Sequence, residues 1–133
     1  MEEPNEQEKQ ELMMKLGFFE QQIRQIQQQI QAIEQGIVEM TSLNSGLEEL
    51  QGKKDAEILA PIGRGIYAKA KLLSEELIVN VGSNNLVTKG ISETRKLIES
   101  QIQKLEEIKV EMNNNLENLG KEIESVMGEK HEH

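Results

Sequence analysis

Residues 12–40 set the fold and read LMMKLGFFEQQIRQIQQQIQAIEQGIVEM. The apolar residues of this stretch recur alternately four and three positions apart, which places one of them per turn on a narrow stripe of a helix. Such a stripe is the seam of a coiled coil, and the pattern predicts a helix over 8–52. The seam residues are Leu12, Leu16, Phe19, Ile23, Ile26, Ile30, Ile33, Ile37 and Met40. After Met40 we expect the seam to shift locally and to continue through Leu43, Leu47 and Leu50.

The last third of the chain repeats this spacing. Its seam residues are Ile98, Ile102, Leu105, Lys109, Met112, Leu116, Leu119, Ile123 and Val126. Lys109 is the one polar member, and the pattern predicts a second helix over 91–127, followed by a disordered tail over 128–133. Two helices of similar length that leave one connecting segment can fold back as an antiparallel pair, with residue numbers across the pair that sum to about 143. Leu16 should then lie close to Met127, where both chain ends meet.

The connecting segment, residues 53–90, has the period of β-strands instead. The predicted strands are 58–62, 66–72, 77–81 and 86–89, with turns at 63–65 and 82–85. The chain is therefore predicted to be mainly α with a small β part: an antiparallel two-helix coiled coil joined by two β-hairpins. Isolated hairpins are marginally stable and expose strand edges. We expect them to pair with hairpins of other chains.

Composition and charge argue against several functions. The net charge of −9 and the pI near 4.8 disfavour nucleic acid as a partner. The chain has no cysteine, and both of its histidines, His131 and His133, lie in the predicted tail, so neither a thiolate metal site nor a Ser-His-Asp set is expected. The acidic N-terminus is unlike a secretory signal, and no apolar run approaches the ~20 residues of a membrane span. We expect a cytoplasmic protein that is no enzyme and that binds no cofactor, metal, nucleic acid or membrane.

The central residues carry a more specific signal. The run Ile58-Leu59-Ala60-Pro61-Ile62-Gly63-Arg64-Gly65-Ile66-Tyr67-Ala68-Lys69-Ala70 resembles the first hairpin of prefoldin alpha subunits, and Val79-Asn80-Val81-Gly82-Ser83 with Leu86-Val87-Thr88-Lys89 resembles the second. Beta-class subunits have one hairpin, so two hairpins select the alpha class. The chain departs from the family at Ala60, where valine is frequent, and at Asn84-Asn85, where glycine and an aromatic residue are frequent. Asparagine tolerates the left-handed conformation that glycine supplies, so the turn can be kept.

The resemblance implies a hexamer of two alpha and four beta subunits. Its hairpins would build a β-barrel platform, and its coiled coils would hold unfolded client proteins and pass them to a group II chaperonin without consuming nucleotide. The residues expected to serve assembly are Ile58, Leu59, Pro61, Ile62, Gly63, Gly65, Ile66, Tyr67, Ala68, Val79, Val81, Gly82, Leu86 and Val87.

A cluster of apolar residues at the ends of the predicted helix pair is the candidate client-binding site. Its members are Met13, Met14, Leu16, Phe18, Phe19, Ile123, Val126 and Met127. Leu16 and Phe19 fit the seam, whereas Met13, Met14 and Phe18 do not, and these surplus side chains should face water. Flexible methionine suits promiscuous binding. The alternative is a passive coiled-coil scaffold or spacer, whose ends should carry polar residues instead.

Overall fold

The computed structural model describes residues 5–131, with two helices and four strands in the order helix, two hairpins, helix. The elements are α1 (Glu6–Leu50), β1 (Glu57–Gly63), β2 (Ile66–Lys71), β3 (Glu76–Asn80), β4 (Leu86–Gly90) and α2 (Ile91–His131). Strands β1 and β2 form one antiparallel sheet, and β3 and β4 form another. The predicted fold class, two long helices with two small hairpins between them, is confirmed.

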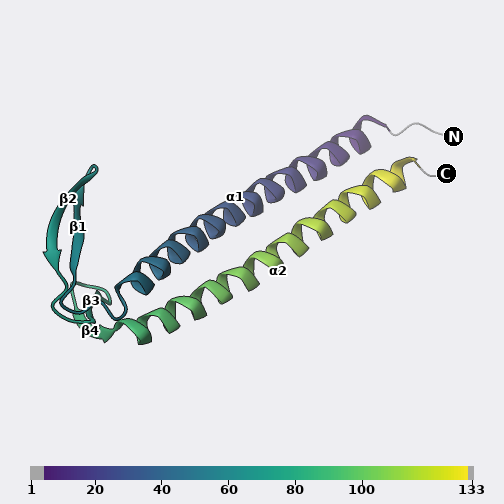
Figure 1. The fold of residues 1–133 in the computed structure, drawn as a ribbon. Helices are drawn as coiled ribbons and strands as arrows, with labels where there is room; N and C mark the ends of the chain where they lie inside the picture. The colour runs from purple at the N-terminus through teal and green to yellow at the C-terminus, as the bar shows by residue number, and fades with distance from the viewer. Residues whose placement is uncertain (1–4, 132–133) are drawn as a thin grey trace. The chain divides into compact units, whose positions relative to one another are not determined.

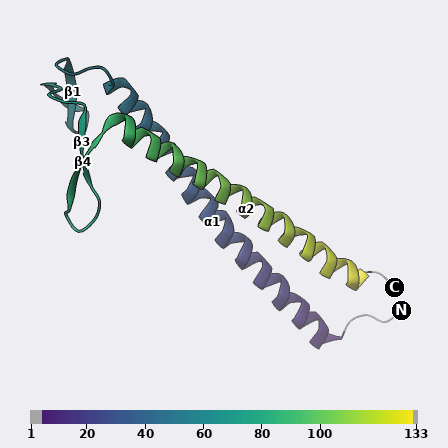
Figure 2. The same ribbon diagram turned by 90° about the horizontal axis from the view of Figure 1, so that it is seen from below.

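The chain divides into two units, which are described separately. The first unit contains α1 up to Ile37 and α2 from Lys104 onwards. Here the two helices run side by side and antiparallel, so that α1 begins where α2 ends (Figures 1 and 2). The ammonium of Lys109 lies 3.4 Å from a carboxylate oxygen of Glu34, and this pair matches the register predicted from the sequence. The contact between Leu16 and Met127 stays a prediction.

The seam of the first unit follows the predicted spacing. Ile30 is buried, and the other predicted seam residues of α1 up to Ile37 are half-buried, as are those of α2 from Leu105 to Val126. Between them the side chains are mostly exposed. Because a two-helix pair can cover each seam residue from one side only, this is the burial expected of an isolated coiled coil.

Helix α1 begins two residues earlier than predicted because of an N-terminal cap. The side-chain oxygen of Asn5 accepts a 2.7 Å hydrogen bond from the amide of Glu8, which satisfies one of the free amides of the first turn. The helix ends at Leu50, before the predicted 52. Gly52 follows with a φ of 74°, the left-handed conformation that terminates many helices and that glycine adopts without strain.

Helix α2 continues to His131, so residues 128–131 of the predicted disordered tail are helical. That part of the prediction is wrong. No proline follows Val126, and the single glycine at position 128 costs a helix only about 1 kcal/mol. The glutamate and lysine that follow it favour a helix. Residues 132–133 of the tail, and residues 1–4 of the acidic N-terminus, lie outside the described part of the chain.

The second unit, Val38–Gln103, contains the end of α1, both hairpins and the start of α2. Its core is a small apolar cluster in which Leu47, Ile91 and Ile98 are buried. Leu77 of β3 packs against this cluster, as do the half-buried Met40, Leu50 and Ile102. The second hairpin is thereby attached to the helices by an apolar contact.

The predicted course of the seam beyond Met40 is wrong at one residue. Leu43 is 53% exposed, and the next residue, Asn44, is half-buried in its place. The regular alternation of four and three therefore continues from Met40 through Asn44 to Leu47. Leu50 is half-buried as predicted, and so is Gln51 just beyond the end of the helix. Arg95 stabilises these two polar residues, because it donates hydrogen bonds to the side-chain amide oxygens of Asn44 and Gln51.

The first hairpin pairs Glu57 with Lys71 at its open end and Pro61 with Tyr67 near its turn. The register shifts between Pro61 and Gly63, where a bulge leaves Ile62 unpaired. Proline has no amide hydrogen to donate, and a two-stranded sheet leaves one side of every strand free, so β1 tolerates it. Gly63 and Gly65 have positive φ values of 145° and 78°, which accounts for both glycines of the turn.

The second hairpin pairs Glu76 with Gly90 and Asn80 with Leu86. Its turn holds Gly82 at a φ of 119° and Asn84 at a φ of 62°. The left-handed conformation predicted for asparagine in this turn is confirmed. The side chain of Asn80 also accepts a 2.9 Å hydrogen bond from the amide of Gly82, which mimics a backbone turn.

Candidate functional site

The apolar cluster predicted for client binding lies in the first unit, at the end of the helix pair where α1 begins and α2 ends (Figure 1). On α1, Met13, Met14 and Phe18 are 71%, 74% and 59% exposed. Leu16 and Phe19 are half-buried on the seam. The division into seam residues and water-facing residues is therefore the one that the spacing predicts.

The α2 side of this cluster is less open. Ile123 and Val126 are half-buried seam residues, and Met127 is 43% exposed. We name the four exposed side chains the apolar tip: Met13, Met14, Phe18 and Met127. They offer water-exposed apolar surface on the outside of two helices rather than a closed pocket.

The chemistry of the apolar tip is limited to non-directional contact. Thioether and phenyl groups gain free energy when any apolar surface covers them, with little demand on the shape of that surface. Removing such side chains from water is worth about 1.5–3 kcal/mol each when burial is complete. One arm would hold a ligand weakly, and several arms acting on the same ligand would add avidity.

The predicted assembly residues lie on the hairpins of the second unit. Most of their large side chains are exposed, including those of Leu59, Ile62, Ile66, Tyr67, Val81, Leu86 and Val87, whereas Ile58 and Val79 are half-buried. Leu73 and Ile78, which the sequence reasoning left out of this set, are also exposed. Strands that expose both their edges and their apolar side chains are unusual on a monomeric protein.

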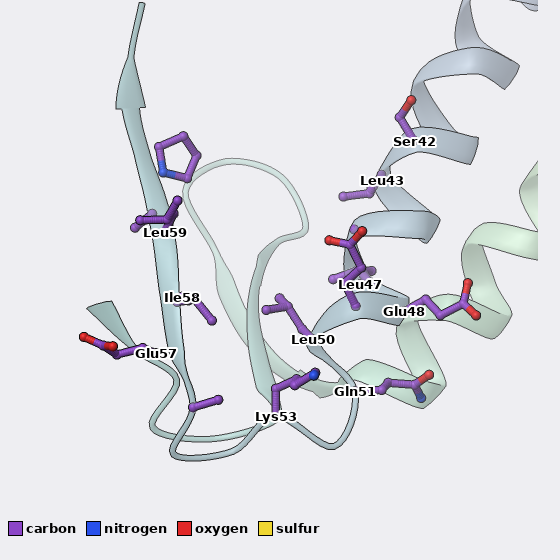
Figure 3. Close-up of a pocket in the computed structure, with 15 residues that line it drawn as sticks. Ser42, Leu43, Leu47, Glu48, Leu50, Gln51, Lys53, Glu57, Ile58 and Leu59 are labelled. Carbon is purple, nitrogen blue, oxygen red and sulfur yellow. The ribbon is translucent and has the colours of Figure 1, made fainter. Parts of the chain in front are cut away.

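Two hollows adjoin the hairpins. The larger, of about 1180 Å³, lies between the last turns of α1 and strand β1, and Leu43, Leu50 and Ile58 point into it (Figure 3). The smaller, of about 590 Å³, is lined by β3 and by both helices, with Leu43 and Leu97 among its walls. Leu43, which the seam excludes, therefore lines both hollows, and its exposure belongs to these surfaces rather than to the coiled coil.

The interactions of Arg95 were missed from the sequence. Its Nε donates a 3.0 Å hydrogen bond to Oδ1 of Asn44, and its Nη1 donates a 2.6 Å bond to Oε1 of Gln51. Its Nη2 lies 3.6 Å from a carboxylate oxygen of Glu48 and 3.8 Å from one of Glu99. Arg95 thus ties the start of α2 to the last two turns of α1. The sequence did contain a signal for this contact, because Arg95 stands three residues before Ile98 and so extends the seam spacing of α2 towards its start.

The described residues offer no site for metal or for a membrane span. Over 5–128, where the side chains are described, no group of three or more Asp or Glu side chains could hold a metal ion. In the same part of the chain neither helix is apolar enough over a sufficient length to cross a bilayer. Of the two histidines, His133 lies outside the described residues and His131 is the last residue of α2. That neither histidine takes part in catalysis stays a prediction.

The chain has the order helix, two hairpins, helix, and it exposes apolar residues on the hairpins and at the end of the helix pair. These features are typical of the class of subunits that assemble with other chains. Comparison with known proteins identifies it. The family described as Prefoldin subunit matches residues 19–130. This chain belongs to the prefoldin family, which is a family of chaperones.

The relatives support the predicted resemblance to alpha subunits. The chain is 34% identical over 98 residues to Prefoldin subunit alpha of Methanobrevibacter smithii, covering 73% of this chain and 67% of the relative. It is 32% identical over 120 residues to Prefoldin subunit alpha of Methanoculleus marisnigri, covering 90% of this chain and 80% of the relative. A cryo-EM structure of filamentous PFD from Methanocaldococcus jannaschii shares the fold, with a TM-score of 0.73, 22% identity, and coverage of 86% of this chain and 96% of that one.

Proposed function

We propose that this chain is the alpha subunit of a cytoplasmic, ATP-independent holdase that binds unfolded proteins at the apolar tip and transfers them to a group II chaperonin. The single observation that carries the proposal is the exposure of Met13, Met14 and Phe18 on a helix whose other exposed positions are largely polar. A passive spacer would be expected to carry polar residues, not exposed apolar ones, at this end of the helix pair. Membership of the prefoldin family supports the same conclusion.

The second part of the proposal concerns assembly. The hairpins pair with those of beta subunits to complete a β-barrel platform in a hexamer of two alpha and four beta subunits. Support comes from the exposed strand edges of two separate two-stranded sheets and from the exposed apolar side chains on them. Burying both in an oligomer would satisfy the free backbone groups and remove apolar surface from water.

Client binding can be tested with a variant that changes the apolar tip alone. The variant carries M13S, M14S, F18S and M127S. All four side chains are exposed, so the seam stays intact. The matched control replaces four exposed polar residues of the same helices: K15S, E20S, Q21S and E124S.

The readout is light scattering from a chemically denatured client diluted into the assembled complex without nucleotide. Losing about 1.4 kcal/mol of apolar contact should raise the half-suppressing concentration of the tip variant by about tenfold, and the control should behave as the wild type. Equal suppression by all three complexes would refute client binding at the apolar tip and favour the passive scaffold.

Assembly can be tested by co-expression with a beta-class subunit from the same source and by measuring the mass of the complex by light scattering. A hetero-hexamer is the expected product. A homodimer that ignores the beta subunit would contradict the assembly proposal. A filament of this chain alone would contradict it as well.

A further inference from the structure

The five methionines in the described part of the chain are sorted by exposure in a way that client binding alone does not require. Met13 and Met14 are 71% and 74% exposed and Met127 is 43% exposed, whereas Met40 and Met112 are half-buried on the seam. Met40 packs against the apolar core of the second unit. Within residues 5–131, the three exposed methionines all belong to the apolar tip.

Two local features leave the α1 thioethers accessible. On a helix, the side chain four residues further along covers the same face, and for Met13 that residue is Gly17, which has no side chain to cover it. The space around Gly17 is also open, since a Cβ built there would meet nothing within 4 Å. Met14 is followed four residues later by Phe18, which is itself exposed.

Accessible thioether sulfur reacts with peroxides. The sulfur attacks the peroxide, the O–O bond breaks, an S=O bond forms, and the other oxygen leaves as water after taking up a proton. The sulfur loses two electrons and the peroxide gains them. The product, methionine sulfoxide, is polar where the thioether was apolar, and methionine sulfoxide reductases reverse the change. The chain has no cysteine that would react in its place.

We propose that Met13, Met14 and Met127 form an oxidant-sensitive modification site. Peroxide converts the apolar tip there into a polar one, and the polar tip no longer binds clients. This inference rests on the proposed function of the tip. The seam methionines Met40 and Met112 are half-buried and therefore react more slowly, so oxidation of the apolar tip leaves the helix pair and the assembly intact. The switch therefore acts on binding without unfolding the subunit.

The test begins with peptide mapping by mass spectrometry of the assembled complex during treatment with hydrogen peroxide. Met13, Met14 and Met127 are expected to take up one oxygen atom each before Met40 and Met112 react. Oxidation of the two seam methionines at the same rate as the exposed ones would overturn the selectivity on which the switch depends.

The functional arm compares the wild type with the variant M13L, M14L and M127L in complexes with the same partner subunits. Leucine keeps the apolar surface and the helix propensity but cannot be oxidised. Peroxide should raise the half-suppressing concentration of the wild type by about tenfold, leave the leucine variant unchanged, and be reversed by methionine sulfoxide reductases. Equal losses in both complexes, or no loss in the wild type, would overturn the proposal.

The serine variant of the apolar tip separates the two levels of the proposal. If untreated serine variant suppresses aggregation as well as the wild type, the tip does not bind clients and the proposed function fails. If the serine variant is impaired while fully oxidised wild type is not, client binding at the tip stands and the oxidation switch alone is refuted.

Discussion

Replacing Arg95 by alanine should weaken the second unit at the point where α1 and α2 meet. The guanidinium of Arg95 makes two hydrogen bonds, of 3.0 and 2.6 Å, to the amide oxygens of Asn44 and Gln51, and its side chain is only 21% exposed. Hydrogen bonds that involve a charged group contribute about 1.5–3 kcal/mol each when buried, and the exposure of this site reduces that amount. The carboxylates of Glu48 and Glu99 are more than half exposed, so these ion pairs add little.

We therefore expect R95A to lower the free energy of unfolding by about 2 kcal/mol. The measurement is urea denaturation followed by far-ultraviolet circular dichroism, with the denaturant dependence of the unfolding free energy unchanged. A double-mutant cycle with N44A should give a coupling of about 1 kcal/mol, because the two residues share a hydrogen bond.

The matched control is K96A, which removes an exposed charge from the next position of the same helix. Surface substitutions of this kind change stability by about 0.5 kcal/mol or less. If R95A destabilised the protein no more than K96A, the hydrogen bonds of Arg95 would contribute nothing to holding the two helices together, and the interpretation of Asn44 as a stabilising seam residue would be wrong.

Three further substitutions test other parts of the structure. G36A should raise the unfolding free energy by about 1 kcal/mol, because alanine favours a helix and its Cβ would meet Leu105 at an ordinary 3.7 Å; a lower melting temperature would contradict the packing at this place. K109L should stabilise the helix pair by about 1 kcal/mol, since an apolar seam residue replaces a half-exposed ion pair with Glu34; a loss of stability would show that the ion pair matters more than burial. Y67D should put a charge on the exposed surface of the first hairpin and reduce the mass of the complex in light scattering while the helical circular dichroism is kept; an unchanged mass would place assembly elsewhere.

The long helices and the hairpins could be predicted because each has its own period in the sequence. Alternating steps of four and three residues define a helix seam, and alternation by two defines strands. The turns were equally clear, since Gly63, Gly65 and Asn84 stand where the backbone has positive φ. The division of the apolar tip into seam residues and exposed residues followed from the same spacing.

The errors have a common cause. Leu43 was assigned to the seam because it is apolar, although the unbroken spacing leads to Asn44. A polar residue can occupy a seam position when a partner satisfies it, and that partner, Arg95, is 51 residues away in the chain. Single-chain periodicity contains no information on such pairs. The end of α2 was placed at 127 because the apolar pattern stops there, but a helix can continue on propensity alone.

Photo-crosslinking of a bound client tests the central claim most directly. A photoreactive phenylalanine analogue would replace Phe18 at the apolar tip or Gln28, an exposed polar residue of the same helix, in the otherwise unchanged complex, which is then mixed with a denatured client and irradiated. Holding of clients at the apolar tip predicts strong crosslinking from position 18 and little from position 28. Equal crosslinking from both positions, or none from position 18 while the complex still suppresses aggregation, would contradict it.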